Sequence, residues 1–181
     1  MGKNHIVWMD LEMTGLDPAK DKIIEIATIV TDADLKIIDR GPCFIIGQSS
    51  STFDLMDKWN QEHHTKSGLW QKVVESSITI EAAEKETLDF LKKHVKPGKS
   101  PLAGNSIWQD RRFIAAHMPS LDQFLHYRLI DVSTLKELSK RWFPKQKPWE
   151  KQNSHRALDD IEESINELLH YRETLFIKPK E

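Results

Sequence analysis

Hydrophobic residues follow two different spacings along the chain, and each spacing predicts its own kind of element. Short runs of β-branched and aromatic residues predict strands within residues 5–10, 23–31 and 35–46. The polar stretch 31–34 (TDAD) separates the second run from the third and predicts a hairpin turn. The first part of the chain is therefore expected to form three consecutive strands.

Apolar residues at three- and four-residue steps predict helices in the rest of the chain. The helical stretches are 55–76 with a break at Gly68, 79–98 with KPG as a stop signal, 108–119 ended by Pro119, and 155–175. Short strands are predicted within 100–106 and at the start of 126–144, which continues as a helix. Three strands followed by alternating helices and strands predict an α/β fold, in which α-helices flank a mixed β-sheet.

Composition and charge narrow the class of protein. The chain has 181 residues, 39% of them hydrophobic and 30% charged, and no repeat or linker divides it, so we expect a single domain over residues 1–181. Its longest apolar runs are shorter than the ~18 residues needed to span a bilayer, so a membrane protein is not expected. The formal net charge is −2 and the basic residues are scattered, so a nucleic-acid ligand would engage only a few phosphates.

The cysteine content bears on the cellular compartment. The single cysteine, Cys43, excludes an internal disulfide, which suits a reducing compartment such as the cytoplasm. A mitochondrial location stays open, because a removed targeting peptide would leave no trace in the sequence.

Two acidic residues lie directly behind the first apolar run. Side chains at positions i and i+2 of a strand point to the same face, about 7 Å apart at their Cα atoms, so Asp10 and Glu12 converge. Like charges this close destabilise each other unless a cation or a proton intervenes. The alternative is a solvated strand edge with two surface acids. Ile6, Val7 and Trp8 argue against it, because they indicate a strand buried on both faces.

Two later motifs also carry an acidic residue. Asp110 follows Asn105 by five positions and lies in a predicted helix, where a solvated helix acid is the alternative. His155 and Asp160 are five positions apart, about 140° round an ideal helix, so they converge only if His155 lies on the entry loop. Acids near this helix start also have a purely structural alternative role, which is to compensate the helix dipole.

Taken in order, D-x-E at Asp10, N-x₄-D at Asn105 and H-x₄-D at His155 resemble the DEDD-type 3′–5′ exonucleases of the ribonuclease H-like fold. The histidine marks the subgroup in which His is the general base. The stretches DLEMTGLD, GNS…QDRRF, HYRLIDVSTLKEL and HRALDDIEESI further resemble the oligoribonuclease family, from Val7 to about Tyr171. The resemblance implies a mixed sheet of about five strands, of which the first three are antiparallel.

The same resemblance implies a metal-dependent 3′–5′ exoribonuclease that degrades very short RNA, dinucleotides in particular, to 5′-mononucleotides. Two divalent cations about 3.5–4 Å apart serve this hydrolysis, and Mg²⁺ or Mn²⁺ suits oxygen ligands. By hypothesis, Asp10, Glu12 and Asp160 hold the first cation, Asp10 bridges to the second, and Asp110 acts largely through coordinated water. His155 takes the proton from the attacking water, because histidine titrates near neutral pH; a surface-loop histidine is the alternative.

The matched motifs also imply substrate contacts. Leu16 and Trp59 would contact bases, each stacked base contributing ~1–3 kcal/mol, although a helix-face core residue is an equal alternative for Trp59. The residues that would cap the 5′ phosphate are Ser106, Arg128, Ser133 and Thr134. For Ser133 and Thr134 the alternative role is to cap the helix that follows. The family resemblance also suggests a homodimer, in which Tyr127 and Arg128 complete the partner's site.

Three competing hypotheses remain open from the sequence. One is a 3′–5′ exonuclease that acts on longer RNA or DNA. Another is a non-catalytic nucleic-acid-binding module, which the presence of all four acids and the histidine disfavours. The last is a structural metal site, which calls for a closed shell of ligands rather than this open set of carboxylates.

Overall fold

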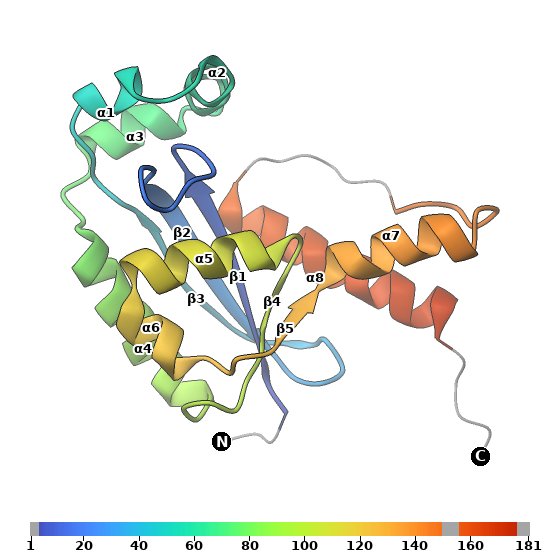
Figure 1. The fold of residues 1–181 in the computed structure, drawn as a ribbon. Coiled ribbons are helices and arrows are strands. Elements are labelled where there is room, and N and C mark those ends of the chain that lie inside the picture. The colour runs from blue at the N-terminus through green and yellow to red at the C-terminus, as the bar shows by residue number, and fades with distance from the viewer. Residues whose placement is uncertain (1–3, 150–155, 177–181) are drawn as a thin grey trace.

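Within residues 4–149 and 156–176, five strands form one mixed sheet in the order β3-β2-β1-β4-β5 (Figure 1). The computed structural model describes residues 4–149 and 156–176. The strands are β1 (Ile6–Met13), β2 (Ile23–Thr31), β3 (Ile37–Ile45), β4 (Leu102–Gly104) and β5 (Leu129–Asp131). β1 pairs antiparallel with β2 and β2 with β3, whereas β4 runs parallel to both β1 and β5. The predicted mixed sheet with three antiparallel first strands is confirmed.

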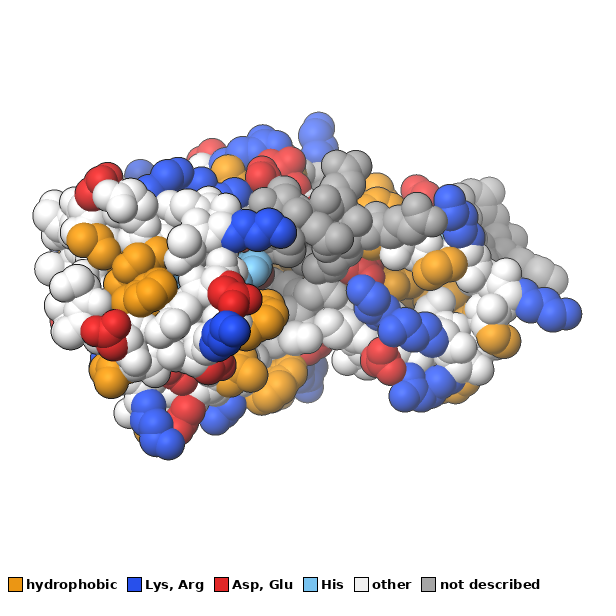
Figure 2. All heavy atoms as spheres, turned by 90° about the horizontal axis from the view of Figure 1, so that it is seen from above, with side chains coloured by type: hydrophobic (Ala, Val, Ile, Leu, Met, Phe, Trp, Pro, Cys, Tyr) orange, Lys and Arg blue, Asp and Glu red, His pale blue; other side chains and the backbone are white. Residues whose placement is uncertain are grey.

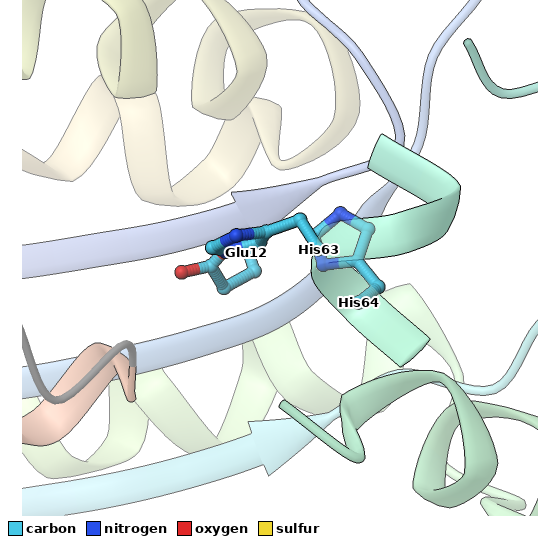
Figure 3. A group of neighbouring side chains, drawn as sticks. All are labelled: Glu12, His63 and His64. Atoms are coloured by element: carbon cyan, nitrogen blue, oxygen red, sulfur yellow. The ribbon is translucent and has the colours of Figure 1, made fainter. Parts of the chain in front are cut away.

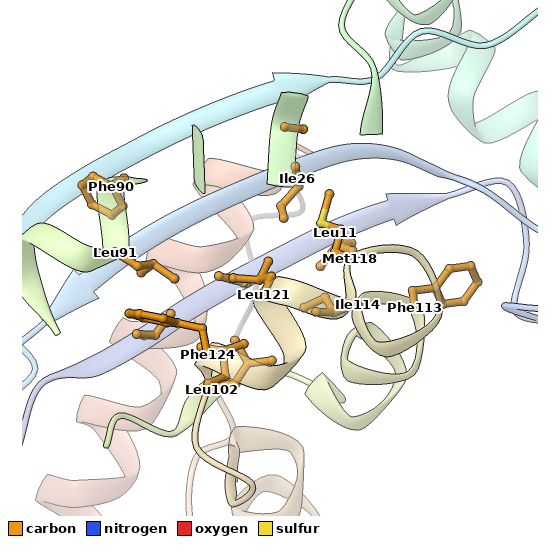
Figure 4. Close-up of a cluster of buried hydrophobic side chains, with 14 of the residues drawn as sticks. Leu11, Ile26, Phe90, Leu91, Leu102, Phe113, Ile114, Met118, Leu121 and Phe124 are labelled. Carbon is orange, nitrogen blue, oxygen red and sulfur yellow. The ribbon is translucent and has the colours of Figure 1, made fainter. Parts of the chain in front are cut away.

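Helices cover both faces of the sheet (Figure 1). The helices are α1 (Ser51–Asp54), α2 (Lys58–Lys66), α3 (Leu69–Glu75), α4 (Ile80–His94), α5 (Ile107–His117), α6 (Pro119–Phe124), α7 (Val132–Trp142) and α8 (Ala157–Leu175). Residues of α4, α5 and α6 pack with the sheet in one core cluster, drawn in Figure 4, and residues of α7 and α8 pack in a second one. No helix within residues 4–149 and 156–176 is long and apolar enough to cross a membrane.

The alternation of side chains along β1 decides which face receives its acids. The odd-numbered residues from Val7 to Leu11 belong to the cluster with α4, α5 and α6. Ile6 and Trp8 belong to the cluster with α7 and α8. Because successive side chains of a strand point to opposite faces, Asp10 and Glu12 lie on the side of α8. β1 continues to Met13, beyond the predicted end at residue 10, so both acids lie within a paired strand.

Local signals in the sequence account for several element boundaries. Gly68 adopts a left-handed conformation (φ 71°) between α2 and α3, which confirms the predicted helix break. The Thr79 side chain accepts a hydrogen bond from the backbone of Ala82 and caps α4. At α7 the capping side chain is Asp131, which accepts from the Ser133 N–H, so the alternative that Ser133 or Thr134 caps this helix is wrong.

Two short helices were not predicted. Pro119 follows the end of α5, as predicted, but it also occupies the first turn of α6, where its fixed φ and missing N–H are tolerated. α1 has four residues and no buried side chain, so it lacks the apolar periodicity that identifies a helix in a sequence.

Candidate active site

Three of the four predicted metal-binding acids meet between β1 and α8. One carboxylate oxygen from each of Asp10, Glu12 and Asp160 lies within 4.8 Å of the others. α8 approaches the sheet closely here, because Ala157 and Ser164, one turn before and after Asp160, are small and buried. The structure thus brings together acids that are up to 150 positions apart in the chain.

Crowding perturbs the central carboxylate of this acidic triad. The pKa of Glu12 is raised to about 8, first by burial and then by the charges of Glu25, Asp160 and Asp110. Arg156 opposes the shift. A divalent cation would relieve the same repulsion and favour the ionised form, so the donor set fits an oxygen-preferring ion such as Mg²⁺ or Mn²⁺.

Asp110 lies on α5, with its carboxylate directed at β1. It is 7% exposed, so the alternative of a solvated helix acid is wrong. Its Oδ1 accepts a hydrogen bond from the Leu11 N–H at 3.0 Å, which ties α5 to β1, the strand that carries Asp10 and Glu12. Burial raises the pKa of Asp110 to about 7, while hydrogen bonds from backbone N–H groups oppose the shift and the charge of Asp131 adds to it.

The structure adds Glu25 to the neighbourhood of the acidic triad, a residue that sequence reasoning missed. Glu25 lies opposite Glu12 in the β1–β2 pair and is fully buried. Its Oε1 accepts a hydrogen bond from Arg156 Nη2 at 3.3 Å, at the start of α8. An acid in the middle of the apolar run IIEIA was the signal that could have found it, since a buried carboxylate requires a partner.

The predicted general base, His155, lies outside the described residues. Its chain neighbour Arg156 is described, and its guanidinium is close enough to the triad to lower the pKa of Glu12. Asp159, the residue before Asp160 on α8, is exposed.

The two hydrophobic residues proposed for base contact are both exposed. Leu16 follows β1, and its carbonyl oxygen accepts a hydrogen bond from Gln109 Nε2 at 2.7 Å, which holds this loop against α5. Trp59 is 66% exposed, so the alternative of a core residue is wrong. Its ring stacks on His63 one turn further along α2, with ring centroids 4.7 Å apart.

Ser106, Ser133 and Thr134 line one surface depression of about 380 Å³, to which Trp108 and Arg141 also contribute. Ser106 has a left-handed backbone conformation, and its N–H donates to Ser133 Oγ at 2.9 Å and to Asp131 Oδ1 at 3.0 Å. Three of the four residues proposed for the 5′ phosphate are therefore neighbours. Arg141 is a cation that sequence reasoning missed, because its helix pattern is that of an ordinary exposed residue.

Arg128, the fourth residue proposed for the phosphate, does not line this depression. Its guanidinium lies over the ring of Tyr127, 5.4 Å from the centroid. Tyr127 is 75% exposed, and both residues precede β5.

A buried polar network holds α8 against the end of β4. Asn105 Nδ2 donates to Ser164 Oγ at 2.9 Å and to Glu167 Oε2 at 3.0 Å. Glu167 is buried, accepts a hydrogen bond from the Tyr171 hydroxyl at 2.9 Å and pairs with Lys136 at 3.4 Å. This network gives Asn105 a structural role in orienting the helix that carries Asp160.

Figure 2 views the molecule from the end of the sheet at which β1 finishes. Acidic, basic, histidine and hydrophobic side chains meet in the middle of this face. A surface with both carboxylates and exposed apolar rings is suited to cations together with a ligand that has charged and aromatic parts.

The fold and the acidic triad define an exonuclease of the ribonuclease H-like class. Residues 7–168 match the family described as Exonuclease (RNase_T). The structure of E. coli exonuclease I in complex with a 5cy-dT13 oligonucleotide shares the fold, with a TM-score of 0.71 and 14% identity. The alignment covers 96% of this chain and 42% of that one, so this chain spans about two fifths of its length.

Closer relatives place the chain within this class. The oligoribonuclease of Alcanivorax borkumensis is 55% identical over 172 residues, covering 94% of this chain and 95% of the relative. The oligoribonuclease of Ruthia magnifica is 57% identical over 171 residues, with the same shares covered. The chain belongs to the oligoribonuclease family.

Proposed function

We propose that this protein is a metal-dependent 3′–5′ exoribonuclease that degrades very short RNA, dinucleotides in particular, to 5′-mononucleotides. The observation that carries the proposal is the convergence of Asp10, Glu12 and Asp160 within 4.8 Å, in a chain of the oligoribonuclease family. Three carboxylates from two distant segments are costly to crowd together unless a cation neutralises them.

The proposed cofactors are two divalent ions, Mg²⁺ or Mn²⁺. Asp10, Glu12 and Asp160 would hold the first and Asp10 would bridge to the second, with Asp110 acting largely through coordinated water. When bound, the ions supply positive charge that stabilises the phosphoryl oxygens in the transition state. Asp110 also holds the β1 backbone at Leu11, so it contributes to the position of its neighbours Asp10 and Glu12.

His155 is the proposed general base, which accepts the proton of the attacking water. The ion pair of its neighbour Arg156 with Glu25 supports this assignment, because it brings the start of α8 to the acidic side of β1. Histidine suits the role, since its unperturbed titration lies near the operating pH.

Substrate recognition would combine stacking with a phosphate contact. Leu16 and Trp59 offer exposed apolar surface to the bases. Ser106, Ser133 and Thr134 offer hydroxyl donors in one depression, and we propose Arg128 as the charged member of the phosphate cap. A site with few cations recognises few phosphates, which fits the net charge of −2 and a very short substrate.

We further propose a homodimer in which Tyr127 and Arg128 complete the partner's site. The exposed, stacked arrangement of the two side chains supports it, because it presents an aromatic and a cationic group outward. Sedimentation of the active protein is the test, and full activity of a monomer would contradict the shared site.

We also propose a single exonuclease domain over residues 1–181, which the family match over residues 7–168 supports. We propose a cytoplasmic location, which the single cysteine supports.

The function is tested with end-labelled dinucleotide and a longer RNA of roughly 20 nucleotides, since a stacking track for long substrates would engage many bases. We expect rapid release of mononucleotides from the dinucleotide with Mg²⁺ or Mn²⁺, slow cleavage of the longer RNA, and no reaction with chelator. Asp10→Asn should lose both turnover and Mg²⁺ binding in calorimetry. Equal metal binding by wild type and Asp10→Asn would contradict the proposal, and faster cleavage of the longer RNA would identify a general exonuclease instead.

A further inference from the structure

Glu12 is shared by two groups of ligand-type side chains. One is the acidic triad with Asp10 and Asp160. The other joins Glu12 to His63 and His64 of α2 (Figure 3), and in this group too one ligand atom from each residue lies within 4.8 Å of the others. The triad offers only oxygen donors, whereas the second group offers two imidazole nitrogens and one carboxylate oxygen.

His64 is already oriented as a metal-binding histidine is. It is 1% exposed, and its Nε2 lies 2.9 Å from the carbonyl oxygen of Met13. A carbonyl oxygen only accepts, so Nε2 carries the hydrogen and Nδ1 carries the lone pair. Within the part of the chain that the structure describes, Nδ1 is buried and has no hydrogen-bond partner. A ring N–H donated to a backbone carbonyl is the usual support of a histidine whose other nitrogen binds a metal.

His63 is held beside His64 by ring contacts. Its ring stacks on Trp59 with an interplanar angle of 8° and meets the edge of the His64 ring at a centroid distance of 5.3 Å.

We propose that Glu12, His63 and His64 form a binding site for a transition-metal ion of the Zn²⁺ type, and that occupation of this site inhibits the enzyme. Two imidazoles and a carboxylate are a known three-ligand set for zinc, which leaves a fourth position open. Mg²⁺ prefers oxygen ligands, so the two groups select different ions. Ligand atoms bound to a tetrahedral zinc ion lie about 3.3 Å from one another. The ligand atoms of Glu12, His63 and His64 lie within 4.8 Å of one another, so small side-chain rotations bring them to this distance.

Inhibition follows from the shared carboxylate. An ion held by both histidines draws Glu12 toward α2 and adds positive charge beside the triad, which weakens the binding of Mg²⁺ there. Only this consequence rests on the proposed function, because binding to Glu12, His63 and His64 is measurable whether or not the protein cleaves RNA.

Binding is tested by calorimetry with Zn²⁺ alone and by the visible absorption of Co²⁺, which is intense in four-coordinate sites and weak in octahedral oxygen sites. His63→Ala should weaken Zn²⁺ binding by about 10- to 100-fold and remove the intense Co²⁺ band. Asp160→Asn, which alters only the acidic triad, should keep both signals. The matched control is His170→Ala, because His170 lies about 15 Å further along α8 than Asp160.

Two outcomes would overturn the site. One is His63→Ala binding Zn²⁺ as tightly as wild type with an unchanged Co²⁺ band, and the other is Asp160→Asn losing both signals, which would place zinc in the acidic triad.

Inhibition is tested separately. Zn²⁺ is titrated against hydrolysis at fixed Mg²⁺, and the rate of each protein is expressed relative to its own zinc-free rate. Half-inhibition of His63→Ala should need about 10-fold more Zn²⁺ than wild type, and equal concentrations would refute the inhibitory role. Absence of hydrolysis without zinc would count against the proposed function and leave the binding result intact.

Discussion

Replacing Glu12 with glutamine should stabilise the metal-free protein at neutral and alkaline pH while it removes a ligand of the proposed metal site. Burial and the neighbouring acids raise the pKa of Glu12 from 4.5 to about 8. The folded state therefore binds a proton more tightly than the unfolded chain. Stability falls as the pH rises above 4.5, and the loss levels off above the folded pKa.

The size of the effect follows from the two pKa values. By proton linkage, the Glu12 carboxyl lowers the free energy of unfolding of the wild type by about 3 kcal/mol at pH 7 and by about 5 kcal/mol at pH 9. At pH 4 it lowers it by almost nothing. Glutamine has nearly the same shape and does not ionise. For a chain of this size the gain at pH 7 corresponds to a rise in Tm of about 6–12 °C.

The assay is urea unfolding in chelator at several pH values between 4 and 9, with Glu173→Gln, an exposed acid of α8, as the matched control. The control should differ from wild type by less than about 0.5 kcal/mol. With Mg²⁺ at about 100 times its Kd, wild type should gain about 2.7 kcal/mol and Glu12→Gln nearly nothing. A Glu12→Gln protein no more stable than wild type at pH 8, or a difference that does not change with pH, would refute the reasoning.

Three further predictions test other parts of the site and fold. At pH 7, binding of Mg²⁺ should release about 0.9 proton from Glu12 and a further fraction of a proton from Asp110, because both pKa values are raised. Calorimetry in buffers of different ionisation enthalpy measures this release, and a release near zero would contradict the raised pKa values. Glu25→Gln should lower the pKa of Glu12, and Arg156→Ala should raise the pKa of Glu12. NMR titration of the Glu12 carboxyl measures both shifts, and titration curves identical to that of wild type would show that these charges do not act on Glu12. Phe113→Ala should cost about 3–5 kcal/mol in urea unfolding, because this ring is fully buried in the cluster of Figure 4; a loss below 1 kcal/mol would mean that the core closes over the cavity.

The comparison between prediction and structure is clearest on β1. The period of a strand is two residues, so the sequence alone placed Asp10 and Glu12 on one face, and the apolar residues before them indicated burial. The sequence also predicted the helical break at Gly68 and the chain segments that form α4 and α8, because glycine geometry and apolar spacing are local properties.

The burial of Asp110 and Glu25 could not be predicted from local sequence patterns in this way. A helix pattern specifies which side of its own helix a residue occupies, whereas the burial of Asp110 depends on α5 lying against β1, where the Leu11 N–H meets its carboxylate. Glu25 became a neighbour of Glu12 only through the register of the β1–β2 pair, and of Arg156 only through the packing of α8 on the sheet.

The sequence by itself thus determined the kinds of elements, the face of β1 that carries the acids, and, through its motifs, the family expectation. The tertiary structure alone decided that α2 brings His63 and His64 to Glu12, and that Arg128 lies over Tyr127 rather than in the serine-lined depression. The physical reason is that local periodicity orients a side chain relative to its own backbone, whereas contacts between distant segments depend on strand order and helix packing. Those are set by the burial of the whole apolar surface at once.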